Sequence, residues 1–195
     1  MNICQIIQNH CAGHIRVVQC VSSELAEEIE RSATLISAAL GRGNKLLVMG
    51  NGGSAADAQH LAAELVGRFL RERRPLPAIA LTTDTSILTA VGNDFGFDQI
   101  FRRQVEALAV PGDIVLGIST SGRSNNVFQA LTAANGIGCT TIALLGRDGG
   151  DIAGLVDVPL TVEAQETPFI QEAHLTIIHI LCDLLENALF PANPA

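Results

Sequence analysis

Hydrophobic residues in the first forty positions follow a helical pattern. They recur every three to four residues, and this spacing predicts a helix whose apolar face is formed by Leu25, Ile29, Ala33, Ile36 and Leu40. Ser22 and Ser23 precede an acidic first turn, as is common where helices begin, and Gly41 is expected to end the helix. We therefore expect a helical region over residues 1–43.

Beyond this region the pattern changes to short runs of consecutive apolar residues. The five runs are Lys45–Met49, Ala78–Leu81, Asp113–Ile118, Thr140–Leu145 and Val158–Val162. Such runs are typical of strands that are buried on both faces. Helical stretches separate most of them, at Ser54–Leu70, Gln99–Leu108 and Ser124–Asn135. This alternation predicts an α/β fold of three layers, with a doubly wound, five-stranded parallel sheet flanked by helices.

A last helix is predicted from about Phe169 to Leu189. Apolar residues cover nearly every side of it, namely Leu175, Ile177, Ile178, Ile180, Leu181, Leu184, Leu185 and Leu189. A helix that is apolar all round has to be buried all round. Either the N-terminal helices cover it or a second subunit does, and we expect a subunit interface. Residues 1–195 are then expected to form one domain, with helices at 1–43 and the α/β core with its C-terminal helix at 44–195.

Composition narrows the class of protein. The chain has 195 residues, of which 48% are hydrophobic and 16% charged, so it can bury a sizeable core and is not a disordered chain. Its net charge of −8 argues against binding to nucleic acids, whose phosphates attract basic surfaces. The five cysteines are odd in number and form no CxxC pair, which indicates neither a disulfide framework nor a zinc ribbon.

No segment of the sequence suggests export or a membrane. The first residues lack the basic start and apolar run of a signal peptide. No stretch approaches the roughly 18 apolar residues that a membrane span needs. We expect a cytoplasmic protein without a membrane partner.

A glycine-rich loop, Gly50–Ser54, follows the first predicted strand and precedes a helix. Glycines let backbone N–H groups approach an anion, and a helix start adds partial positive charge. Two alternatives remain open: a plain turn in which Ser54 caps the helix, and a dinucleotide-binding loop. The second uses Gly50, Gly52 and Ala55 as G-x-G-x-x-A, but Asp84 lies about ten residues beyond the usual spacing of roughly 20 for the ribose-binding acid.

A hydroxyl-rich loop follows the third predicted strand, again before a helix. It contains Ser119, Thr120, Ser121 and Ser124 around one glycine. Hydroxyls at a helix start suit a phosphate monoester, and the lack of a GxxxxGK[ST] motif excludes a nucleoside triphosphate loop. A hydroxyl-rich turn capped by Ser124 is the simpler alternative, but four hydroxyls exceed what a cap requires.

Acid/base residues lie on two of the predicted helices. His60 and Glu64 are four residues apart and therefore share one helix face, where they could transfer protons, hold half of a metal site or form a solvated polar stripe. The last helix carries His174 and His179, and His179 lies between two isoleucines. A core histidine bonded to a backbone carbonyl is the usual explanation, and the pattern alone does not choose which histidine is functional.

These motifs together resemble the sugar isomerase (SIS) domain family and, within it, the bacterial phosphoheptose isomerases. The resemblance covers nearly the whole chain. In addition to the two loops it rests on the segments Ala56–His60, Ala63–Leu65, Val91–Asp94, Gly146–Gly150, Ile170–His174 and Ile178–His179. Each motif is modest alone, but this order and spacing are specific. One position departs from the family, because Phe169-Ile170 precede Gln171 where an arginine is common.

The resemblance implies an aldose–ketose isomerase that converts sedoheptulose 7-phosphate to D-glycero-D-manno-heptose 7-phosphate, the first step toward the heptose of lipopolysaccharide. It implies that Glu64 moves a proton through an enediol, with His179 as acid/base partner. The phosphate is expected at Ser54, Ser119, Thr120, Ser121 and Ser124, and the rest of the substrate at Asn51, Gly52, Gly53, Asn93, Asp94 and Gln171. Some members bind zinc at positions matching His60, Glu64, Gln171 and His179, and none needs a nucleotide cofactor.

The family also implies a homotetramer with active sites between subunits. One competing hypothesis is a non-catalytic SIS protein that binds the bacterial replication initiator, which the segments Arg74–Leu81 and Leu181–Leu184 resemble. Such relatives tend to lack the acid/base pair, whereas this chain has both Glu64 and His179. The enzyme is therefore the favoured hypothesis, and a sugar-phosphate-sensing regulator is a weaker third.

Overall fold

The computed structural model, which describes residues 2–191, is built around one parallel sheet. Its strands lie in the order β2-β1-β3-β4-β5, and every neighbouring pair is parallel. The strands span Leu46–Gly50 (β1), Ala78–Ala80 (β2), Ile114–Ser119 (β3), Thr140–Gly146 (β4) and Val158–Val162 (β5). The predicted fold class, a five-stranded parallel sheet with helices on both sides, is confirmed.

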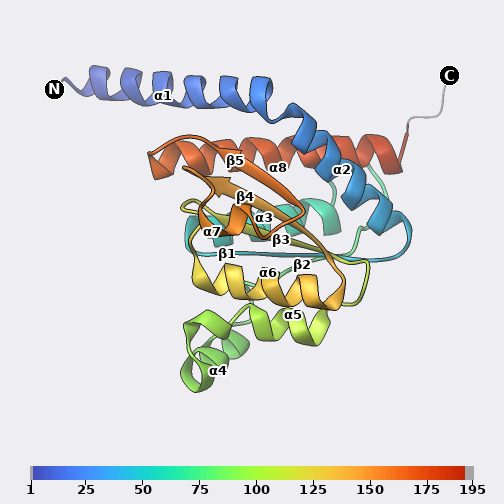
Figure 1. Cartoon of the computed structure of the whole chain (residues 1–195). Coiled ribbons are helices and arrows are strands. Elements are labelled where there is room, and N and C mark those ends of the chain that lie inside the picture. The colour runs from blue at the N-terminus through green and yellow to red at the C-terminus, as the bar shows by residue number, and fades with distance from the viewer. Residues whose placement is uncertain (1, 192–195) are drawn as a thin grey trace.

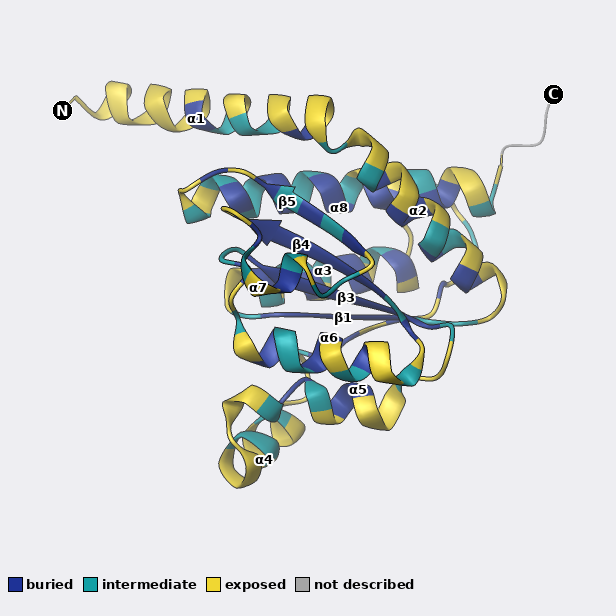
Figure 2. Cartoon of the chain, in the orientation of Figure 1, coloured by how far each residue is buried: buried dark blue, intermediate teal, exposed yellow. Residues whose placement is uncertain are grey.

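Two layers of helices cover the faces of the sheet (Figure 1). One face packs against α2, α3 and α8, and the long α1 lies outside them; their bounds are Ile3–Glu24 (α1), Ala26–Gly41 (α2), Gly53–Val66 (α3) and Thr167–Leu189 (α8). The other face packs against Arg102–Leu108 (α5), Asn125–Ile137 (α6) and Gly150–Ala153 (α7). Figure 2 shows the strands and the inward faces of these helices buried, whereas α1 is largely exposed.

Charged residues explain why two strands begin later than predicted. Lys45 and Asp113 were expected inside strands, but β1 begins at Leu46 and β3 at Ile114. The Asp113 carboxylate is buried, accepts hydrogen bonds from the backbone N–H groups of Lys45 and Val110, and lies 2.6 Å from Lys45 Nζ. It thereby pairs the polar groups at the amino edge of the sheet. These bonds hold the pKa of Asp113 below its ordinary value even though burial alone would raise it.

One helix was not predicted, and another is shorter than predicted. The missed helix, α4 (Thr85–Phe95), has no buried residue and therefore gives a weak apolar pattern; a short turn at Phe97–Gln99 follows it. The stretch predicted at Ser54–Leu70 begins at Gly53 and ends at Val66. Residues 67–75 form an extended connection instead, and their polar contacts prove important below.

Most of the apolar surface of α8 is covered within the same chain. Ile177, Ile178, Leu181 and Leu185 are fully buried in a cluster that includes α2, α3 and the sheet. The argument that a second subunit must cover this helix is therefore wrong for these residues. Ile180, which is 37% exposed, and the partly exposed Leu184 remain on its outer side.

Candidate active site

The loops that follow β1 and β3 meet at one edge of the sheet. These strands are adjacent and parallel, with Gly50 beside Ile118, so the glycine-rich loop and the hydroxyl-rich loop start side by side. The carboxyl edge of an open α/β sheet is where such folds bind ligands. Two helices, α3 and α6, begin there and direct their free N–H groups toward the same region.

The glycine-rich loop ends in a helix that Ser54 does not cap. The first helical residue is Gly53, so Ser54 lies inside α3, where it is 3% exposed. No side chain caps this helix start. The interpretation of Ser54 as a helix cap is therefore wrong, and its hydroxyl is not committed to that bond. A Cβ atom at position 53 would collide with the side-chain amide of Gln171 on α8, so glycine there permits this close approach.

The dinucleotide-binding alternative is not supported at its acidic position. Asp84 is the N-cap of α4, and its carboxylate accepts a hydrogen bond of 2.9 Å from the backbone N–H of Ile87. This carboxylate already has a structural partner at a helix start. It is not placed as the free ribose acceptor that such a site requires.

The hydroxyl-rich loop is organised by bonds between its own side chains. The Oγ atoms of Ser119 and Ser124 lie 2.9 Å apart. Ser124 stands at the N-cap position of α6 but makes no side-chain cap bond, so the simple capping interpretation is wrong here as well. Thr120 and Ser121 are half-buried between them. The loop therefore holds four hydroxyls beside an uncapped helix start, as an oxyanion site requires.

A pair of asparagines ties the two loops together. Asn51 donates to Asn126 Oδ1 at 2.9 Å, and Asn126 donates in return to Asn51 Oδ1 at 2.8 Å. Asn126 lies in the first turn of α6 and was not predicted as a site residue. Its position two residues after Ser124 was the available sequence signal. The reciprocal bond fixes the distance between the glycine-rich and hydroxyl-rich loops.

The acid/base residues of α3 and α8 converge. His60 Nε2 and His179 Nε2 lie 2.9 Å apart, and His60 Nε2 lies 3.5 Å from Glu64 Oε1. A bond between two ring nitrogens requires one to donate and the other to accept. The Phe69 ring stacks on His179 with centroids 5.6 Å apart. The side chains of His60 and Glu64 are 39% and 22% exposed, so a ligand can reach them.

The other histidine of α8 is the structural one. His174 is fully buried, and its Nε2 donates to the backbone carbonyl of Leu145 at 2.9 Å. Burial lowers the pKa of His174 to about 4, so it is neutral at physiological pH. The description of a core histidine bonded to a carbonyl therefore fits His174, whereas His179 is half-buried and faces Glu64 and His60.

Asp57 is a further polar residue near this cluster that the sequence did not single out. It is half-buried on α3, one turn before His60, and its Oδ2 atom has no hydrogen-bond partner among residues 2–191. Burial raises the pKa of Asp57, and the nearby His60 opposes this shift. An aspartate among alanines three residues before a histidine was the signal available in the sequence.

Asn93 and Asp94 lie elsewhere in the chain. Both are exposed on α4, and the hydrogen bond given for their side chains joins them to each other. Figure 1 shows α4 beyond α5 and α6, on the opposite side of the sheet from α8. A single chain therefore does not bring these two residues to His60, Glu64 and His179.

Phe169, at the position that departs from the family pattern, docks α1 onto the start of α8. A Cβ atom at position 13 would collide with the Phe169 ring, so Gly13 allows helix and ring to touch. The ring also contacts His10, with centroids 5.0 Å apart. Phe169 thus contributes to packing between helices where an arginine would contribute charge.

The predicted zinc ligands do not have the spacing of a metal site. Within residues 2–191, no group of three or more His, Cys, Asp or Glu side chains is arranged to hold a metal ion. Two imidazoles on one tetrahedral zinc would place their nitrogens about 3.4 Å apart, given Zn–N bonds of about 2.0–2.1 Å. The observed 2.9 Å between His60 and His179 is a hydrogen-bond distance. The arrangement does not fit a bound ion.

Comparison with known proteins identifies the family. The sequence profile of the SIS domain matches residues 10–146. A protein from Geotalea daltonii named phosphoheptose isomerase is 65% identical over 184 residues, which cover 94% of this chain and 96% of that protein.

Solved structures agree with this assignment. A phosphoheptose isomerase from Neisseria gonorrhoeae superimposes with a TM-score of 0.91 and 46% identity, covering 95% of this chain and all of that one. One from Francisella tularensis gives 0.93 and 39%, covering 96% and 100%. The chain therefore belongs to the SIS domain family and, within it, to the phosphoheptose isomerase enzymes.

Proposed function

We propose that the protein converts sedoheptulose 7-phosphate to D-glycero-D-manno-heptose 7-phosphate. The observation that carries this proposal is the convergence of Glu64, His60 and His179 at the same sheet edge as two loops suited to an anion. A carboxylate and an imidazole side by side can move protons, and the hydroxyl-rich loop can hold the phosphate at the far end of a seven-carbon sugar. The family assignment supports the same reaction.

In the proposed mechanism the substrate reacts as its open-chain ketose. The Glu64 carboxylate removes a proton from C1, and the electrons of that C–H bond form the C1–C2 double bond of an enediol. His179 moves a proton from the C1 hydroxyl to the C2 oxygen. Glu64 then returns its proton to C2, which leaves the aldehyde at C1. The atoms and electrons balance within the substrate, so the reaction needs no redox cofactor.

The remaining site residues are proposed as substrate contacts. Ser54 and the four hydroxyls of the Ser119–Ser124 loop bind the phosphate, supported by their position beside two helix starts. Asn51, Gly52, Gly53 and Gln171 line the sugar, supported by the packing of Gln171 on Gly53. Asn93 and Asp94 can contribute only from another subunit, given their place on α4.

We propose a homotetramer whose active sites lie between subunits. Support comes from the isolated position of Asn93 and Asp94 and from apolar side chains exposed on α1. Those side chains are Ile3, Ile6, Ile7 and Ile15, each more than half exposed within the single chain. A second copy would remove this apolar surface from water, which favours association.

Zinc binding is proposed as a separate property that the mechanism above does not use. His60, Glu64, Gln171 and His179 offer nitrogen and oxygen atoms of the kind that ligate zinc. The two ring nitrogens would have to separate by about half an ångström to accommodate an ion. The test is metal content after equilibration with zinc and dialysis, compared between wild type and His60→Ala.

A cytoplasmic location and a role in making lipopolysaccharide heptose are also proposed. All five cysteines are free, as in proteins kept in a reducing compartment. No helix within residues 2–191 combines the length and apolar character needed to cross a bilayer. The alternative of a non-catalytic initiator-binding protein is not favoured, because the acid/base residues converge and the close relatives are named as enzymes.

The decisive experiment incubates the purified protein with sedoheptulose 7-phosphate and follows the sugar by NMR. Appearance of an aldose anomeric signal in the wild type, and its absence with Glu64→Gln, supports the proposal. No aldose from a folded wild-type protein would refute it.

A further inference from the structure

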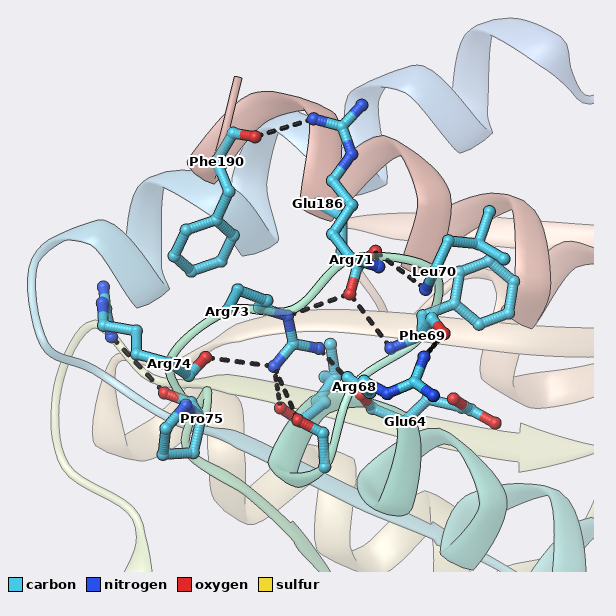
Figure 3. Close-up of polar contacts among 12 residues, drawn as sticks. Glu64, Arg68, Phe69, Leu70, Arg71, Arg73, Arg74, Pro75, Glu186 and Phe190 are labelled. Atoms are coloured by element: carbon cyan, nitrogen blue, oxygen red, sulfur yellow. Dashed lines mark hydrogen bonds and ion pairs between the residues drawn. The ribbon is translucent and has the colours of Figure 1, made fainter. Parts of the chain in front are cut away.

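A buried ion pair lies at the junction of α3 and α8, away from the substrate loops. Arg73 Nε lies 3.0 Å from Glu186 Oε1, and both side chains are only 1% exposed. Arg73 belongs to the extended connection after α3, and Glu186 lies near the end of α8. Figure 3 shows the guanidinium between the Glu186 carboxylate and the end of α3. A charge pair this well buried is costly unless further hydrogen bonds satisfy it.

The Glu186 carboxylate satisfies its remaining acceptors with the backbone of the connection. It receives hydrogen bonds from the N–H groups of Phe69, Leu70 and Arg71, at 3.0, 2.9 and 2.8 Å. Burial would raise the pKa of Glu186, but these bonds and Arg73 outweigh it and keep the pKa below its ordinary value. The carboxylate therefore remains ionised and fixes three consecutive residues of the connection.

Arg73 holds the other side of the junction. Its guanidinium donates to the backbone carbonyls of Glu64 and Leu65, at 2.8 and 2.7 Å, and to those of Gly67 and Arg74. The carbonyls of the last turn of a helix have no partner inside the helix. Arg73 supplies those partners for α3, and one of the carbonyls belongs to Glu64 itself.

These contacts lead from the ion pair to both proposed proton-transfer residues. Arg73 bonds to the backbone of Glu64, and Glu186 fixes the backbone of Phe69, whose ring stacks on His179. His179 and Glu186 are seven residues apart and therefore lie on the same face of α8. One buried pair thus fixes the backbone under the carboxylate and the ring beside the imidazole.

We propose that Arg73 and Glu186 are positioning residues that set the placement of Glu64 and, through Phe69, of His179. Neither touches the substrate. The pair acts by holding the end of α3 and the connection against α8, so that the acid and base keep a fixed separation. Proton transfer is sensitive to such placement, since a misplacement of about 1 Å can cost roughly 100-fold in rate. The proposal rests on the proposed roles of Glu64 and His179.

The test compares clamp variants with a matched control. Arg73→Met, Glu186→Gln and Phe69→Leu should each lower kcat by about 10- to 100-fold with little change in KM, because the phosphate loops are untouched. Phe69→Tyr keeps the ring and should restore kcat. Asp113→Asn is the control, since Asp113 is also a buried carboxylate bonded to backbone N–H groups and one cation, but at the opposite edge of the sheet. It should lower stability and leave kcat unchanged.

A second measurement follows the clamp without using activity. Stacking on Phe69 should shift the His179 ring protons upfield in NMR spectra of histidine-labelled protein. Glu186→Gln should move that signal toward its position in Phe69→Leu, whereas Asp113→Asn should not move it. If Arg73→Met or Glu186→Gln does not fold, Phe69→Leu decides alone, because Phe69 is half-buried and outside the core.

The outcomes separate this proposal from the function on which it rests. Clamp variants that fold and keep wild-type kcat, or an Asp113→Asn variant that loses as much kcat, would overturn the positioning role. An inactive Glu64→Gln beside fully active clamp variants refutes only the clamp. Wild-type turnover in Glu64→Gln refutes the assigned base, and the His179 NMR signal then still reports whether the clamp orders that ring.

Discussion

The Nε2 atoms of His60 and His179 lie 2.9 Å apart although 119 positions separate the two residues in the chain. One is on α3 and the other on α8, and these two helices pack side by side on the same face of the sheet. Because α3 begins at the glycine-rich loop, the pair also lies near the proposed phosphate site. The packing of α3 on α8 is thus the feature that assembles an acid/base centre.

Replacing Glu64 by Gln should abolish turnover and preserve binding. Gln has nearly the same shape but cannot accept the C1 proton at neutral pH. Loss of a positioned acid/base group typically costs about 10²–10⁴ in rate, and more where it is the only base. Turnover is measured by NMR and binding of sedoheptulose 7-phosphate by calorimetry. His179→Ala should also lose turnover, and wild-type rates in both variants would reject the mechanism.

The double substitution Ser121→Ala with Ser124→Ala should weaken binding of the sugar phosphate. It removes two hydroxyls of the loop, one of which bonds to Ser119. A hydrogen bond to a charged group contributes about 1.5–3 kcal/mol, so the affinity should fall at least tenfold. Calorimetric titration with the sugar phosphate measures this. Thr132→Ala, which removes an exposed hydroxyl elsewhere on α6, is the control. Unchanged affinity in the double variant would place the phosphate elsewhere.

The protein should lose stability as pH falls from about 6.5 toward 4, in part through His174. Its pKa is about 4 in the folded protein against an ordinary 6.5, because burial disfavours the charged ring. In this window the unfolded chain binds a proton that the native state does not, so unfolding becomes more favourable as pH falls. The full contribution is about 3 kcal/mol, at 1.36 kcal/mol per pKa unit.

This pH dependence is checked by urea denaturation of wild type and His174→Gln at several pH values. Gln can still donate to the Leu145 carbonyl but does not titrate. The difference in unfolding free energy between the two proteins should change in favour of the variant between pH 6.5 and 4. Parallel curves would show that His174 does not cause the effect.

The protein should behave as a homotetramer in solution. The apolar side chains exposed on α1 give a second copy a surface to cover. Light scattering at micromolar concentration should give about four times the chain mass of 20.5 kDa. Ile7→Glu with Ile15→Glu should reduce that mass and also reduce activity, whereas Arg42→Glu on an exposed turn should do neither. A wild-type mass of one chain would contradict the proposed assembly.

The sequence by itself determined the architecture and the kinds of chemistry present. Consecutive apolar runs such as Thr140–Leu145 specify strands buried on both faces, and alternation with helices leaves a parallel sheet as the simplest arrangement. The glycine-rich and hydroxyl-rich loops were also evident, since glycine and serine at the end of a strand are local signals. The same pattern failed for α4, because a helix with no buried residue leaves little periodicity.

Only the tertiary structure decided which residues meet. Sequence could not choose between His174 and His179, because both lie on one apolar helix, and burial against Leu145 or contact with His60 depends on packing. Nor could it connect Arg73 with Glu186, 113 residues apart, in a stretch that looked like a continuation of the helix. Local propensity acts over a few residues, whereas the partner of a buried charge is set by which helices the sheet brings together.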